Sequence, residues 1–161
     1  MVSAPVDAVR RAVHEVPDPE LPFLTIGDLG IVRDVRLPET SDGTVEIDIT
    51  PTYTGCPATE AIADAVADAV RAVGHAHVRV RSVLAPAWST DWISDTGRDK
   101  LREAGISPPG PAGTVGLGLP PACPRCGSAL TRELSFFGST ACQARYVCGA
   151  CLEPFDHVKP L

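Results

Sequence analysis

Four of the six cysteines form two Cys-x-x-Cys pairs near the end of the sequence. Cys123 and Cys126 make the first pair, Cys148 and Cys151 make the second, and residues 127–147 lie between them. Each pair turns the backbone so that both sulfurs can reach one ion, and two pairs complete a tetrahedral site. This spacing predicts a structural metal site of the zinc-ribbon type. Because four thiolates suit zinc and iron alike, the spacing leaves the identity of the metal open.

The segment around these pairs, residues 122–161, has too little apolar content to hold a fold without such a staple. We therefore expect a zinc-ribbon-like β module in which the metal contributes folding free energy directly. Cys142 falls in a predicted strand, residues 140–147, and would lie roughly 20 Å from Cys148, too far to bind the same ion. It is either a small buried side chain or a second thiol for transient chemistry. His157 would be a surplus ligand and is left out of the site.

Cys56 stands apart, at the point where a strand pattern changes to a helix pattern. Upstream, residues 44–50 alternate apolar and polar side chains, as in a strand with one buried face. Downstream, residues 58–73 repeat apolar side chains at helical spacing. Pro57 fits the first helical position, which makes Cys56 the expected N-cap. A sulfur at the positive end of a helix dipole favours the thiolate, which is both a nucleophile and a metal ligand.

The elements that position Cys56 form a small α/β domain. The patterns predict an amphipathic helix at the start of the chain, a hairpin of strands at residues 31–37 and 44–50, and a third strand at residues 77–84. The helix between the last two strands implies a crossover. The expected fold class is therefore α+β or α/β, a two-layer domain of about three strands with helices on one face.

The remaining segments set the domain boundaries. A helix capped by Ser94 runs to Ala104, and residues 108–121 consist mostly of proline and glycine, which indicates a linker. We expect a first domain at residues 1–107, this linker, and the ribbon module at residues 122–161. Trp88 and Trp92 either pack in the core or contact a partner, and core packing is favoured. His75 and His77 either lie in an exposed loop or bind a metal, and the exposed loop is favoured.

Three carboxylates lie upstream of the hairpin. Asp18 and Glu20 stand among prolines that hold the backbone extended, and Asp28 stands in a glycine-containing return before the strand. Taken alone, the segment with Asp18 and Glu20 is a solvated turn. Near a thiolate, the same groups are supporting ligands or partner contacts.

Composition and charge argue against several classes of function. The net charge of −6 is against a nucleic-acid-binding surface. No apolar run approaches a membrane span, and the first residues lack the pattern of a secretory signal. We therefore expect a cytoplasmic protein whose paired cysteines bind metal rather than form disulfides.

The motifs Asp18-Pro19-Glu20, Ile26-Gly27-Asp28-Leu29-Gly30-Ile31-Val32 and Thr52-Tyr53-Thr54-Gly55-Cys56-Pro57 resemble the metal–sulfur cluster biosynthesis family of small α/β domains. This resemblance implies a role in maturing iron–sulfur enzymes, with Cys56 at the position of the family's candidate cluster-binding cysteine. Residues 86–93, 97–109, 137–142 and 153–155 are similar to accessory subunits of bacterial phenylacetyl-CoA ring epoxidases, enzymes of phenylacetate degradation. The implied partners are the other epoxidase subunits or their reductase.

The expected function is therefore that of an accessory maturation factor and not of an enzyme. No phosphate-binding loop, Ser/His/Asp set or pair of Glu-x-x-His helices is present. Since a cluster ordinarily needs four protein ligands, Cys56 would hold iron or a cluster transiently, with further ligands from a second subunit, a partner or a small thiol. Three alternatives remain open: a non-catalytic adaptor, a thiol-dependent enzyme using Cys56, and a nucleic-acid-binding ribbon.

Overall fold

The computed structural model describes residues 5–37, 43–53, 55, 57–110 and 120–160. The chain divides into two units, Met1–Trp88 and Ser89–Leu161, and each has its own sheet. Within the described ranges, no helix is long and apolar enough to cross a membrane.

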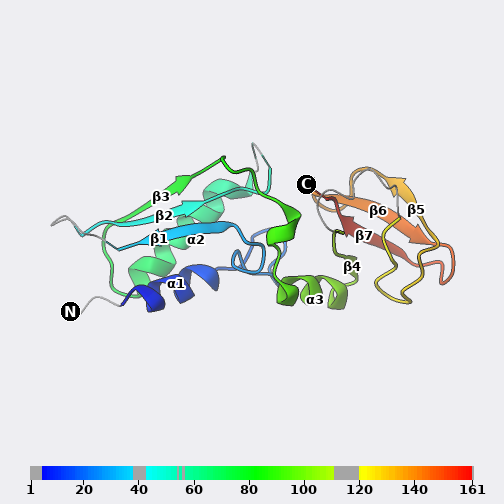
Figure 1. Cartoon of the computed structure of the whole chain (residues 1–161), viewed down its shortest axis with the longest axis horizontal. Coiled ribbons are helices and arrows are strands. Elements are labelled where there is room, and N and C mark those ends of the chain that lie inside the picture. The colour runs from blue at the N-terminus through cyan, green and yellow to red at the C-terminus, as the bar shows by residue number, and fades with distance from the viewer. Residues whose placement is uncertain (1–4, 38–42, 54, 56, 111–119, 161) are drawn as a thin grey trace. The chain divides into compact units, whose positions relative to one another are not determined.

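The first unit is a two-layer α/β fold. Its sheet has the order β1-β2-β3, in which β1 (Val32–Arg36) is antiparallel to β2 (Val45–Ile49) and β3 (Val78–Ser82) is parallel to β2. The parallel pair is joined by the crossover helix α2 (Ala58–Ala72), and α1 (Val6–His14) packs against α2 and β1. Both helices lie on one face of the sheet (Figure 1). The expected fold class is confirmed.

The core lies between the sheet and the two helices. Alternate residues of β2, Val45, Ile47 and Ile49, are at most 1% exposed because they face this layer. The helices and the loop before β1 supply the other fully buried large side chains: Val9, Val13, Val66, Val70, Leu24, Ile26 and Ile31. Apolar alternation in the strands and helical spacing in α2 therefore meet in a single buried layer.

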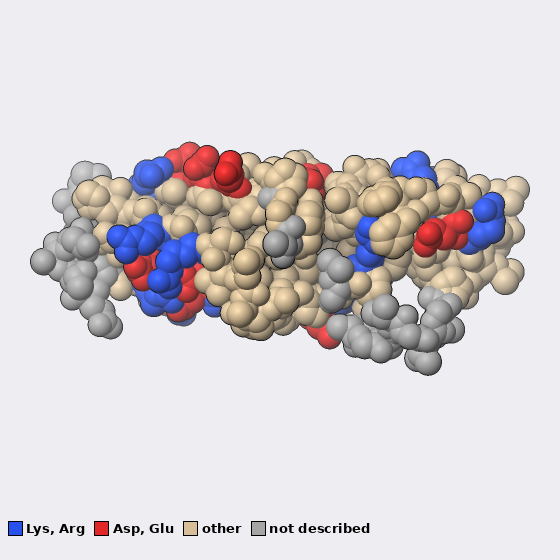
Figure 2. Space-filling view, turned by 90° about the horizontal axis from the view of Figure 1, so that it is seen from above, with Lys and Arg blue, Asp and Glu red and all other residues tan. Residues whose placement is uncertain are grey.

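The opposite face of this sheet carries a network of opposite charges. Asp48, at the centre of β2, accepts hydrogen bonds from Arg81 Nε at 2.8 Å and from Arg36 Nη2 at 2.9 Å. The neighbouring strands extend the network through Asp34 to Arg36 and through Arg79 to Glu46. Figure 2 shows basic and acidic side chains gathered over this unit. Hydrogen bonds from Arg81 and then Arg36 outweigh burial and lower the pKa of Asp48.

The second unit contains a helix and a four-stranded sheet. Its helix α3 (Asp95–Glu103) begins as expected at Ser94, whose Oγ accepts a hydrogen bond from the Gly97 amide at 3.0 Å. A short 3₁₀ helix, Thr90–Trp92, precedes it. Arg98 holds this segment together by donating to the carbonyls of Thr90 and Pro109.

The sheet of the second unit has the order β4-β7-β6-β5. Strands β5 (Thr131–Ser135), β6 (Gln143–Cys148) and β7 (Pro154–Val158) form an antiparallel meander. Strand β4 (Ile106–Ser107) is parallel to β7. The structure therefore groups residues 89–107 with the ribbon, whereas the patterns predicted a first domain that runs to residue 107. This grouping arises because β4 pairs with β7, a long-range contact that no local sequence pattern predicts.

Two local expectations differ from the structure. Helix α2 begins at Ala58, and Pro57 occupies the N-cap position rather than the first helical one, although its φ of −64° and ψ of −23° are already helical. His75 is 6% exposed, so the expectation of an exposed loop holds for His77 and is wrong for His75. Trp88 is buried and its indole donates to the Leu29 carbonyl at 2.8 Å, as core packing predicts.

Replacing Asp48 by Asn is expected to lower the free energy of unfolding of the first unit by about 1–2 kcal/mol at pH 7, because Arg36 and Arg81 lose a charged acceptor on a partly screened face. Since the folded pKa of Asp48 is lowered, its contribution is present above the unfolded pKa of about 3.9 and is lost as the pH falls through the folded value. Hydrogen exchange of the β2 amides measures both effects.

The matched control is Glu46→Gln. Glu46 accepts from Arg79 at 3.1 Å and pairs with Arg36 at 3.5 Å, and its side chain is 30% exposed against 11% for Asp48. A loss for this variant as large as that for Asp48→Asn would contradict a special role for the central carboxylate.

Candidate metal centre

Two backbone turns of the same kind present the paired cysteines. In the first, the Gly127 amide donates to the Cys123 carbonyl at 2.9 Å, and in the second, the Leu152 amide donates to the Cys148 carbonyl at 3.0 Å. The residue that closes each turn has a left-handed backbone, with φ of 73° at Gly127 and 64° at Leu152. The Cys-x-x-Cys spacing therefore produces two equivalent knuckles, as the sequence predicts.

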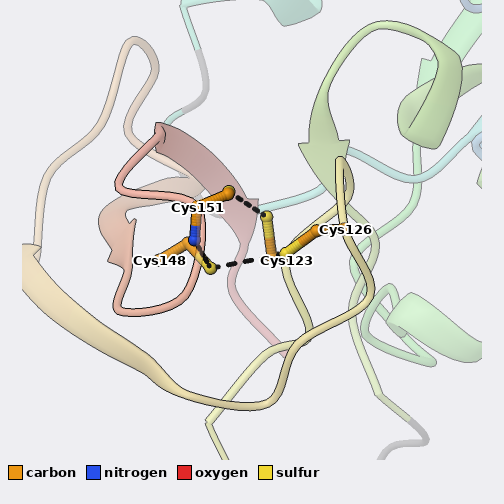
Figure 3. Close-up of side chains that lie close together, drawn as sticks. All are labelled: Cys123, Cys126, Cys148 and Cys151. Atoms are coloured by element: carbon orange, nitrogen blue, oxygen red, sulfur yellow. Dashed lines mark hydrogen bonds between the residues drawn. The ribbon is translucent and has the colours of Figure 1, made fainter.

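The four sulfurs converge on one point (Figure 3). All four Sγ atoms, those of Cys123, Cys126, Cys148 and Cys151, lie within 4.8 Å of one another. Across the knuckles, Cys123 and Cys151 are 3.7 Å apart and Cys126 and Cys148 are 3.6 Å apart. A tetrahedral ion with bonds of about 2.3 Å to sulfur needs sulfur–sulfur edges of about 3.8 Å. The donor set and its spacing fit such an ion.

The pKa shifts of the thiols also favour binding of a cation at this site. The amides of Cys151 and Ala150 donate to Cys148 Sγ and lower the pKa of this thiol to about 6. The Glu153 amide favours a Cys151 thiolate, but burial and the neighbouring sulfurs outweigh it and raise the pKa of Cys151 to about 12. At Cys126 the Ser128 backbone favours the thiolate, yet Cys148 and burial raise its pKa as well. One thiolate thus opposes the next, and a bound cation would remove this opposition.

The centre lies at the edge of a small apolar cluster. Cys123 and Cys148 are 2% and 0% exposed and pack with Phe155, against which Tyr146 is stacked. Cys126 and Cys151 are exposed. Two of the candidate metal ligands, Cys123 and Cys148, therefore belong to the buried apolar cluster of this unit, so the metal site coincides with the core of the ribbon.

Cys142 and His157 lie outside the group of four sulfurs. Cys142 is half-buried, its Sγ is 3.0 Å from Thr140 Oγ1, and its carbonyl accepts from the Lys159 amide. His157 Nδ1 is 3.1 Å from the Ser107 carbonyl, and burial lowers the pKa of this imidazole although the Ser107 contact opposes the shift. His157 therefore helps to join β4 to β7, a role that the sequence pattern does not indicate.

The three carboxylates upstream of β1 belong to the first unit. Asp18 is buried, and its Oδ1 accepts from the amides of Glu20 at 2.9 Å and Leu21 at 2.8 Å. Asp28 Oδ2 accepts from the Thr25 amide, while the Asp28 amide donates back to Thr25 Oγ1, both at 3.0 Å. Both aspartates thus fix the backbone of this loop. The interpretation as a solvated turn is therefore wrong for Asp18, which is buried.

Glu20 differs from the two aspartates because it is exposed. Partial burial and then the charge of Asp18 raise its pKa. The structure does not gather the three carboxylates into one cluster, since among the described residues the group of four cysteines is the set of ligating atoms that converges.

The loop that carries them lies at the end of the sheet where β2 stops. The Thr50 amide donates to the Ile31 carbonyl at 2.9 Å, which joins the end of β2 to the start of β1. Thr50 Oγ1 is buried and has no hydrogen-bond partner among the residues that the structure describes, and no sequence signal singles it out. Cys56, which follows in the connection to α2, lies outside the described residues. Since Pro57 is the N-cap residue of α2, the prediction that Cys56 is the N-cap is wrong.

Replacing Cys148 by Ser is expected to abolish retention of one metal ion per chain, because three thiolates remain and the buried corner of the site is lost. Loss of the ion should also unfold the ribbon, since the metal substitutes for a core there. Elemental analysis of the purified protein measures the first effect, and proteolysis after residue 120 measures the second. Cys142→Ser is the control and should keep the full metal content; equal losses in both variants would contradict the assignment of the four ligands.

Comparison with protein families gives two matches along the chain. Residues 6–82 match the model of iron–sulfur cluster assembly proteins, and residues 108–159 match the model of the PaaD zinc β-ribbon domain. The two matches correspond to the α/β fold and to the segment that carries the four cysteines.

Similar proteins and structures agree with these matches. A protein from Escherichia coli K12, described as a candidate D-type subunit of 1,2-phenylacetyl-CoA epoxidase, is 50% identical over 96% of this chain and 92% of its own length. An Fe-S protein maturation auxiliary factor from Porphyromonas gingivalis is 33% identical over 54% of this chain and 81% of its own.

Two solved structures share the fold. A domain of unknown function, DUF59, from Bacillus anthracis has a TM-score of 0.53 at 28% identity, covering 60% of this chain and 90% of its own. A conserved hypothetical protein from Thermotoga maritima has a TM-score of 0.51 at 25% identity, covering 63% and 98%. The chain therefore belongs to the PaaD-type family of phenylacetyl-CoA epoxidase subunits, which joins an iron–sulfur cluster assembly domain to a PaaD zinc β-ribbon domain.

Proposed function

We propose that this protein is a maturation factor for a phenylacetyl-CoA epoxidase system and that it holds iron or an iron–sulfur cluster transiently at Cys56. The observation that carries the proposal is the match of residues 6–82 to the iron–sulfur assembly model within a chain that is half identical to a candidate epoxidase subunit over nearly its full length. An accessory role is also what the Porphyromonas gingivalis relative is named for.

The position of Cys56 in the chain supports the proposal. Strand β2 ends at Ile49 and α2 begins at Ala58, so Cys56 precedes the amino end of a long helix by one proline. The partial positive charge at that end favours a thiolate. Since iron–sulfur clusters ordinarily take four protein ligands, a single cysteine gives incomplete ligation, which lets the cargo leave.

The loop before β1 has a supporting role in this proposal. Asp18 and Asp28 use carboxylate oxygens on loop amides and so hold the loop rigid at the sheet end where β2 stops. Glu20 is the carboxylate of the three that is exposed, and its raised pKa reflects partial burial beside Asp18. We assign Glu20 to contact with the cargo or a partner, and the two aspartates to positioning.

The ribbon's ion has a different role from the cargo. Cys123, Cys126, Cys148 and Cys151 would hold a resident zinc in a closed tetrahedral site, and iron satisfies the same geometry. Such an ion supplies folding free energy to a module with a very small core. The four thiols leave no open position, so the ribbon takes no part in cargo exchange.

The partners follow from the same relationship. The Escherichia coli relative is named as a subunit of an epoxidase. The clients of this protein would therefore be the other epoxidase subunits or their reductase. In this role the protein is an accessory component and does not itself perform the epoxidation.

The proposal is tested by iron, acid-labile sulfide and zinc per chain after anaerobic purification and reconstitution, with Cys56→Ser as the variant. We expect about one ion in the ribbon of both proteins, and iron with sulfide in the wild type alone. Cys142→Ser, which removes another thiol outside the ribbon site, is the matched control and should load like the wild type.

Two results would count against the proposal. If the wild type takes up no iron or sulfide, Cys56 has no cargo, and the protein would be an adaptor that docks epoxidase components. If Cys56→Ser loads as well as the wild type, the cargo binds elsewhere.

A further inference from the structure

The second knuckle contains a residue whose backbone is unsuited to its side chain. Leu152 closes this turn with φ of 64°, whereas the equivalent residue of the first knuckle is Gly127 with φ of 73°. A left-handed backbone is strained for a non-glycine residue, a cost that glycine avoids. The Leu152 side chain does not recover this cost by burial, because it is 76% exposed. Stability therefore gives no reason for leucine at this position.

A second exposed leucine lies beside the same knuckle. Leu130 is 72% exposed, its carbonyl accepts from the Gly149 amide at 2.6 Å, and its Cβ would be 3.7 Å from a Cβ on Gly149. Leu130 and Leu152 thus flank the Cys148–Cys151 turn with apolar surface. Exposed apolar side chains that gather at one place are typical of protein–protein interfaces.

The charge next to these leucines is unpaired. Arg132 follows Leu130 by two residues and is exposed, and within the described ranges no group bonds its guanidinium. Other arginines of this unit are paired, Arg125 with Glu153 at 2.6 Å and Arg145 with Asp156 at 3.0 Å. We call Leu130, Arg132 and Leu152 the knuckle patch. An unpaired guanidinium beside exposed leucines is complementary to a carboxylate at the rim of an apolar pocket.

The patch lies at the edge of the sheet. Strand β5 is the last strand in the order β4-β7-β6-β5, so Arg132 lies on an edge strand. An exposed aromatic pair of the same unit, Phe136 and Phe137, is less suited to docking. The two rings contact each other, and the Lys159 ammonium lies 4.1 Å from the Phe136 ring centroid. There the cation is already engaged within the chain.

We propose that the knuckle patch docks an epoxidase component that presents an apolar pocket bordered by a carboxylate. Leu130 and Leu152 enter the pocket, and Arg132 pairs with the carboxylate. This inference rests on the proposed function for the identity of the partner. It gives the ribbon a task beyond its own folding, which is to bring the client to the cluster-carrying domain of the same chain.

The test measures the affinity of the full-length protein for each of the other purified components of the epoxidase system from the same organism. Leu152→Gly removes the side chain and the backbone strain together, so this variant should keep its metal and its thermal stability while binding at least about tenfold more weakly. Arg132→Glu should weaken binding by a similar factor and reduce its dependence on salt. Leu84→Ser, which changes a leucine of the first unit that is 57% exposed, is the matched control and should bind like the wild type.

Three outcomes would overturn the inference: wild-type affinity in Leu152→Gly, an equal loss in Leu84→Ser, or no binding of the wild type to any component. These outcomes are separate from failure of the proposed function. If the patch variants lose binding while Cys56→Ser loads iron and sulfide fully, the docking inference is supported and the proposed cargo site at Cys56 is wrong. If loading depends on Cys56 as expected while the patch variants bind like the wild type, the proposed cargo site is supported and the docking inference is wrong.

Discussion

The second unit depends on the convergence of four thiols on one point. Sulfurs 3.6–3.7 Å apart across the knuckles match the edges of a metal-centred tetrahedron, and without a cation each thiolate opposes the next. The apolar cluster around them is small, since Cys123 and Cys148 pack there with Phe155. The metal therefore takes the place that a hydrophobic core takes in a larger domain, and the loops between the strands can carry exposed side chains without loss of the fold.

The two units solve the problem of stability in different ways. The first buries an apolar layer between its sheet and two helices, which leaves the loops at one end of that sheet free to carry chemistry. Asp18 and Asp28 hold one of these loops, and the connection that contains Cys56 leaves the same end. The ribbon, held by its own ion, provides surface. We propose that a chain built this way binds cargo with one unit and a client with the other.

Much of this organisation could be predicted from local patterns. The alternation in β2, the helical spacing in α2 and the Cys-x-x-Cys pairs each depend on short-range geometry, so they predict a strand, a helix and two knuckles correctly. The parts that could not be predicted depend on contacts between distant segments. The pairing of Ile106 with Asp156, the burial of His75 and the orphan hydroxyl of Thr50 have no periodic signal. The roles of Asp18 and Asp28 as loop acceptors appear only when the loop backbone is seen.

Transfer of cargo is the step on which this account of the protein stands. The decisive experiment incubates the anaerobically reconstituted protein with the cluster-free reductase component of the epoxidase system, in the presence of a chelator that captures released iron, and follows cluster formation in the reductase. We expect the reductase to gain its cluster faster from the loaded protein than from equal amounts of free iron and sulfide, and we expect no such gain with Cys56→Ser. A reductase that gains its cluster no faster from the loaded protein than from free iron and sulfide would contradict the account.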